Sequence, residues 1–190
     1  FVEWLNTKYK LPYGPKLTSN FVKSLMMFKQ IVDEEIESAI LVDDDVAFHA
    51  DWIEYFESIP DEIEQVGFIN LGTCPFFNFK PELKKVFELP NNGGCESVWV
   101  SKKFADGFMK NLNMDEAIDI AWHGFMVAGR TPTIGMPLCH QTSGLEKHSI
   151  LDHETRQSSN WMAYVANYKS VRKLDFNKLL EEFKQFEEKK

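Results

Sequence analysis

The chain has 190 residues, of which 44% are hydrophobic and 26% charged, and its formal net charge at pH 7 is -8. A chain of this size can bury a hydrophobic core without disulfides or structural metals, so we expect a single domain over residues 1–190. The negative charge argues against a nonspecific nucleic-acid binder, because affinity for a polyanion comes from clustered Lys and Arg. An anionic ligand would therefore need a metal ion or a local basic patch.

The cysteines and the apolar stretches indicate the compartment. The three cysteines, Cys74, Cys95 and Cys139, form no CxxC pair, which argues against a disulfide framework or a zinc ribbon. No apolar stretch reaches the length of a membrane span, and residues 1–10 lack the layout of a signal peptide. We therefore expect a reducing, cytoplasmic location. Because the sequence begins with Phe1 rather than Met, we also expect a fragment of a longer product.

In the first part of the chain, helical periodicity alternates with short apolar runs. The pattern predicts, in order, a loop over 10–16, a helix from Thr18 or Ser19 to about Ile36, a strand covered on both faces over 39–42, a short helix opened by Asp51, and a buried strand over 66–72. Because helices and strands alternate, we expect an α/β fold. Its sheet would be single, mixed and mostly parallel, with helices on both faces.

The second part continues the alternation with longer connections. The pattern predicts a long loop over 73–92, a strand over 96–101, a helix capped by Ser101, a helix from about Asn113, a short edge strand over 131–138, a polar loop over 139–149, and a solvated terminal helix over 175–190.

Asp43, Asp44 and Asp45 directly follow the strand predicted over 39–42. Ligands of open α/β sheets bind beyond the carboxyl ends of strands, and adjacent carboxylates repel unless a cation offsets their charge. In an extended segment Asp43 and Asp45 would share one side, suited to Mg²⁺ or Mn²⁺, while Asp44 would face away into hydrogen bonds of the fold. The motif therefore predicts a metal site, with a diphosphate-bearing substrate as a hypothesis. The alternative is a solvated acidic turn.

Two other uses of an acidic strand end lack their motifs. A nucleotide hydrolase would need GxxxxGK[ST], which is absent from the sequence. A phosphatase with a DxDx[TV] motif would need Thr or Val where the chain has Ala47.

The helix predicted from about Asn113 carries a further polar group. Asp115, Asp119 and His123 are four residues apart and so lie on one face, with Trp122 beside them. Asp115 needs no function there, because a carboxylate complements the dipole at a helix N-terminus. Asp119 lies further along the predicted helix, between the apolar residues Ile118 and Ile120.

The ordered set of these segments resembles glycosyltransferases of the GT-A fold, in which a DxD motif binds a metal and, through it, the diphosphate of a nucleotide sugar. The resemblance covers roughly residues 18–149. The order of the segments is similar to that in LPS-type glycosyltransferases with an EDD-like motif. The chain resembles still more closely the small glycosyltransferase domain encoded by chlorella viruses. The segments that carry the resemblance are "VDDD" and residues 19–37, 66–72, 91–109 and 118–126.

The resemblance implies transfer of a sugar from a nucleoside-diphosphate donor, with UDP-sugars favoured, to a hydroxyl of a glycan or glycoprotein acceptor. Mn²⁺ (or Mg²⁺) would be the cofactor. Asp45 would be the most direct metal ligand, Asp43 would share the metal or the ribose, and His140 would be a third ligand. A virus-encoded chain would work in the host cytoplasm. In this family a β-α-β unit that carries the nucleoside usually precedes DxD, and the residues before Asp43 predict no first strand.

The remaining site residues follow from the same resemblance and from sugar chemistry. The donor side would comprise Asp44, Gly93, Gly94, Glu96, Trp122 and His123. An inverting transfer needs a base for the acceptor proton, and Asp119 is the candidate. Three alternatives stay open: a plain loop at the glycine pair, a core role for Trp122, and a structural role for His140. For the whole chain, a non-catalytic nucleotide-sugar or carbohydrate-binding module and a phosphoryl-transfer enzyme stay open as well.

Overall fold

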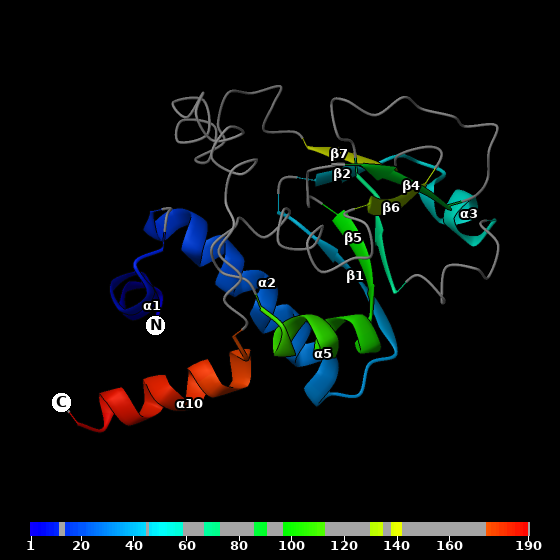
Figure 1. The fold of residues 1–190 in the computed structure, drawn as a ribbon. Coiled ribbons are helices and arrows are strands. Elements are labelled where there is room, and N and C mark those ends of the chain that lie inside the picture. The colour runs from blue at the N-terminus through cyan, green and yellow to red at the C-terminus, as the bar shows by residue number, and fades with distance from the viewer. Residues whose placement is uncertain are drawn as a thin grey trace.

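The computed structural model describes residues 1–11, 14–44, 46–58, 67–72, 86–90, 97–112, 130–134, 138–141 and 174–189. Its helices are α1 (Val2–Tyr9), α2 (Pro15–Asp33), α3 (Trp52–Glu57), α5 (Lys102–Lys110) and α10 (Phe176–Glu187) (Figure 1). Its strands are β1 (Ser38–Val42), β2 (Val46–Phe48), β3 (Phe68–Asn70), β4 (Val86–Pro90), β5 (Ser97–Ser101), β6 (Arg130–Ile134) and β7 (Cys139–Gln141). None of the helices in these ranges combines the length and the apolar composition that a membrane span needs.

The strands form a five-stranded sheet in the order β1-β5-β3-β6-β4 and a two-stranded sheet of β2 and β7. In the larger sheet β3 and β6 are parallel, whereas β1 with β5, β3 with β5 and β4 with β6 are antiparallel. The predicted α/β class is confirmed, but the prediction of one mostly parallel sheet is wrong. The strands β1 and β3 do run in the same direction, as a helical crossover between them requires, yet β5 lies between them in the opposite direction.

Several strands differ from their predicted places. β1 is an edge strand with partly exposed residues, so the prediction of a strand covered on both faces is wrong. β6 lies between β3 and β4, so it is not the predicted edge strand. β4 falls inside the predicted loop over 73–92, and β7 opens the predicted polar loop over 139–149. These are short strands whose partners are distant in the sequence, and local composition does not reveal such pairings.

Successive residues of the central strands pack on opposite faces of the larger sheet, as the strand period requires. Phe68, Val98 and Val100 lie in the cluster with α1, α2, α5 and α10, while Ile69 and Trp99 lie in a second cluster with residues of β2 and α3. Figure 1 shows α2, α5 and α10 grouped on one side of the sheet and α3 on the other. Helices therefore contact both faces.

The helix predicted from Thr18 or Ser19 begins earlier, at Pro15, with Gly14 as its N-cap. Proline is well suited to the first helical position because its ring presets φ and its missing N–H would have no helical partner there. Thr18 is instead buried inside α2, where its hydroxyl accepts a hydrogen bond from Asn6 Nδ2 at 2.8 Å. This contact joins α2 to α1, a helix that the sequence pattern did not predict.

The terminal helix α10 is less solvated than predicted. Its Phe176 and Leu179 are buried in the main core, and Phe183 lies 5.5 Å from the ring of Trp4 on α1. On the outer side Lys8 donates a hydrogen bond to Glu182, which raises the pKa of Lys8 and lowers that of Glu182. The helix therefore docks its apolar stripe on α1 and leaves its charged face in water.

The predicted cap of α5 is present, because Ser101 Oγ accepts a hydrogen bond from the backbone N–H of Phe104 at 3.2 Å. Ser101→Ala is expected to lower the free energy of unfolding by about 1 kcal/mol, since one amide of the first turn loses its acceptor. Urea unfolding followed by circular dichroism measures the change. Ser101→Asp should retain most of the stability, and Ser19→Ala, at an exposed site in α2, should change little. An equal loss in the alanine and aspartate variants would contradict the capping role.

Candidate functional site

One edge of the larger sheet gathers the carboxyl ends of three strands. β1, β3 and β6 run in the same direction, and β5 begins where they end, with Val42 opposite Ser97 and Asn70 opposite both Val98 and Thr133. The chain leaves β1 at these strand ends through Asp43. We therefore call this end of the sheet, where β1, β3 and β6 stop, the Asp43 edge. Ligands of open α/β sheets bind at such edges, because loops and unpaired backbone groups are available there.

Among the described residues, two buried polar side chains lie at the Asp43 edge. Asn70 is almost fully buried, and its Oδ1 accepts a hydrogen bond from the backbone N–H of Gly72 at 3.0 Å. Ser97 is fully buried, and its Oγ has no hydrogen-bond partner within the described part of the chain. An unsatisfied buried hydroxyl costs about 1–3 kcal/mol, so native proteins rarely leave one without a reason. Ser97 lies opposite Val42, which is the last residue of β1 and directly precedes Asp43.

Asp43 is held by an ion pair. Its Oδ1 accepts a hydrogen bond from Lys23 Nζ of α2 at 2.9 Å, and its side chain is 22% exposed. The sheet ladder stops at Val42, and Asp44 is an exposed turn residue. The extended backbone on which the predicted alternation depends is therefore absent at Asp44, and a shared side for Asp43 and Asp45 stays a prediction. Asp45 lies outside the described residues.

The strand that follows the aspartates pairs with the strand that contains His140. In the antiparallel ladder of β2 and β7, Ala47 is opposite His140 and Phe48 is opposite Cys139. The small sheet is attached to the Asp43 edge, since the N–H of Leu138 donates to the carbonyl of Leu71, just after β3, at 2.9 Å. The fold thus brings together the backbone of His140 and the segment that begins two residues after Asp44, although they are far apart in the sequence.

The other residues predicted for the site fall outside the described ranges. They are Asp45, Gly93, Gly94, Glu96, Asp119, Trp122 and His123. Their predicted roles stay predictions, as does the helix from about Asn113. Before β1, residues 1–11 and 14–37 contain two helices and no strand, so they provide no β-α-β unit for a nucleoside.

Three described residues of this edge were missed from the sequence alone. Lys23 lies on an amphipathic helix, where an exposed lysine has no distinguishing pattern. Asn70 interrupts the apolar run "VGFINLG", and Ser97 stands at the start of "SVWVS". A polar residue at the end of an otherwise apolar strand was the available signal, because such a residue must find partners when it is buried.

The donor chemistry of the predicted metal ligands suits a hard or intermediate cation. Two carboxylates and an imidazole, from Asp43, Asp45 and His140, match the preferences of Mn²⁺, and the carboxylates match those of Mg²⁺. Of these side chains the structure describes Asp43. Across the ranges described, no group of three His, Cys, Asp or Glu side chains is arranged to hold a metal ion. The Ser97 hydroxyl, which has no hydrogen-bond partner among the described residues, lies on the sheet face that carries Trp99, whereas Lys23 reaches Asp43 from α2 on the other face.

Comparison of the chain with known proteins adds no assignment. No protein-family model matches the sequence, and no curated protein matches it. The function must therefore be inferred from the Asp43 edge itself. There Asp43 forms an ion pair with Lys23, the small sheet of β2 and β7 is attached through Leu138, and the buried Ser97 hydroxyl has no partner among the described residues.

Proposed function

We propose that the chain is a metal-dependent glycosyltransferase. It would transfer a sugar from a nucleoside-diphosphate donor, with UDP-sugars favoured, to a hydroxyl of a glycan or glycoprotein acceptor. The pairing of β2 with β7 supports this function most directly, because it joins the strand of His140 to the strand that follows the aspartates. The resemblance to GT-A glycosyltransferases implies that these two stretches supply ligands to one metal site, and such a site requires their backbones to be close.

The proposed roles divide between metal, donor and acceptor. Asp43, Asp45 and His140 would hold Mn²⁺ or Mg²⁺, which when bound neutralises charge on the departing nucleoside diphosphate. Asp44, Gly93, Gly94, Glu96 and His123 would contact the donor. Trp122 would stack on a sugar face, and Asp119 would accept the proton of the acceptor hydroxyl. β1, β3 and β6 run in one direction into the Asp43 edge, which supports a site beyond their carboxyl ends.

Nucleotide-sugar turnover tests the proposal. With Mn²⁺ present, a panel of UDP-, GDP- and CMP-sugars is expected to include one donor that the protein hydrolyses slowly and transfers faster when an acceptor glycan is added. Chelation with EDTA should reduce both rates to background, and Mn²⁺ should restore them. Liquid chromatography of the released nucleotide measures each rate.

The same panel separates the competing functions. Binding of a nucleotide sugar without turnover would favour a binding module that lacks catalysis. Release of phosphate from phosphate esters, with no turnover of nucleotide sugars, would favour a phosphoryl-transfer enzyme. Full activity in EDTA would contradict a metal-dependent mechanism.

A further inference from the structure

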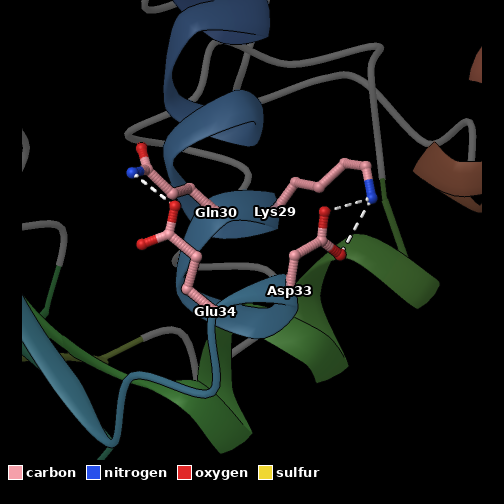
Figure 2. A network of polar contacts seen from close by, with 4 residues as sticks. All are labelled: Lys29, Gln30, Asp33 and Glu34. Carbon is pink, nitrogen blue, oxygen red and sulfur yellow. Dashed lines mark hydrogen bonds and ion pairs between the residues drawn. The ribbon is translucent and has the colours of Figure 1, made fainter.

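A shallow groove runs along the outer face of α2, with a volume of about 390 Å³. Its lining includes Lys23, Met26, Lys29, Gln30, Asp33 and Glu34. Most of the polar residues there pair within the helix, as Figure 2 shows: Lys29 donates to Asp33 at 2.7 Å and Gln30 donates to Glu34 at 3.0 Å. Lys23, one or two turns earlier, instead reaches out of the helix to Asp43.

The Lys23–Asp43 pair differs from the pairs within α2 because its carboxylate belongs to the candidate site. Lys29 and Lys23 both lie on α2, but Asp33 belongs to the same helix, whereas Asp43 directly follows β1 at the Asp43 edge. The Lys23 side chain is 49% exposed and that of Asp43 is 22% exposed. Ion pairs this open to water are weak, so either partner can exchange for another charge.

A cation bound by Asp43 would bring a bound phosphate within reach of Lys23. Ligand oxygens lie about 2.0–2.2 Å from Mg²⁺ or Mn²⁺, so two oxygens on one ion are about 3–4.4 Å apart. Lys23 Nζ is already 2.9 Å from Asp43 Oδ1. A small rotation of its flexible stem would move the ammonium from the carboxylate to such a phosphate oxygen, and lysine binds phosphate as a point charge.

We propose that Lys23 is a diphosphate-binding residue that exchanges partners. It neutralises Asp43 in the ligand-free protein and pairs with the donor's diphosphate once a divalent cation binds Asp43. This inference rests on the proposed function. Lys23 would also supply the local positive charge that an anionic ligand needs on a chain with a net charge of -8.

Lys23→Met is expected to shift two affinities in opposite directions. Without the competing ammonium, the Kd for Mn²⁺ alone should fall about two- to tenfold. The Kd of the tightest-bound of UDP, GDP and ADP, measured in saturating Mn²⁺, should rise about tenfold, because a charge-assisted hydrogen bond to phosphate is lost. Isothermal titration calorimetry measures both constants. Lys29→Met is the matched control and should change neither by more than about twofold.

The outcomes separate this inference from the proposed function. Opposite shifts in Lys23→Met, with nucleotide affinity largely kept in Lys23→Arg, support the exchange. If the wild-type protein binds Mn²⁺ and a nucleoside diphosphate but Lys23→Met leaves either affinity unchanged or weakens both, the exchange is wrong and the proposed function stands. If the wild-type protein binds neither Mn²⁺ nor any of the three nucleotides, both are wrong. Thermal unfolding of each variant checks that the fold is retained.

Discussion

Phe28→Ala is expected to lower the free energy of unfolding by about 3–5 kcal/mol, which is a large share of the stability of a typical domain. Phe28 is fully buried on α2, and its ring meets those of Phe104 and Phe108 on α5 edge-to-face, at centroid distances of 6.4 and 5.7 Å. Truncation would remove both contacts and leave a cavity between the two helices.

Urea unfolding monitored by tryptophan fluorescence measures this loss. Met26→Ala, on the same helix but 48% exposed, is the matched control and should change stability by no more than about 0.5–1 kcal/mol. Phe28→Leu should fall between the two, because it keeps most of the apolar volume. A loss in Phe28→Ala as small as that of the control would show that α2 and α5 are not packed through this ring in solution.

The buried face of α2 was predictable because its signal is local. Apolar residues three and four positions apart predict one buried stripe, and Phe21, Leu25, Phe28 and Ile31 are indeed buried. The same holds for the buried strand β3, the strand β5 and the Ser101 cap, all of which depend on neighbouring residues in the sequence.

The order of the strands was not predictable in this way. Periodicity indicates that a segment is a strand and which residues share a face, but it does not say which strand lies beside it. The alternation of β1, α3 and β3 led to the correct relative direction of β1 and β3, and it missed the insertion of β5 between them. Such pairings depend on contacts between segments far apart in the chain.

The candidate site shows the same division. The strand end at Asp43 was predictable from an apolar run that stops in carboxylates. The Lys23 ion pair and the burial of Ser97 were not, because each depends on a neighbour brought in by the tertiary fold. The extended backbone expected at Asp44 is absent for a local reason, since a turn follows the strand there.

Asp119→Asn is expected to lower the rate of sugar transfer by about 10²–10⁴-fold, the usual contribution of a general base, under the proposed function. Asparagine keeps the size of the side chain but cannot accept the proton of the acceptor hydroxyl. The Kd of the nucleotide-sugar donor should stay within about twofold of the wild-type value, because a group that acts only on the acceptor proton adds little to ground-state donor binding. Single-turnover kinetics and calorimetry measure the two quantities separately.

Asp45→Ala provides the contrast that makes this result informative. If Asp45 is the metal ligand of the proposed function, its loss should weaken Mn²⁺-dependent donor binding as well as transfer, whereas Asp44→Ala, at an exposed turn residue, should cost less. Asp119→Asn should lower only the rate of transfer, whereas Asp45→Ala should lower both the rate of transfer and the affinity for the donor. This difference would separate the base from the metal site. Unchanged transfer in Asp119→Asn would remove Asp119 from the role of base. Weakened donor binding in that variant would move Asp119 to the donor side, and another residue would have to take the acceptor proton.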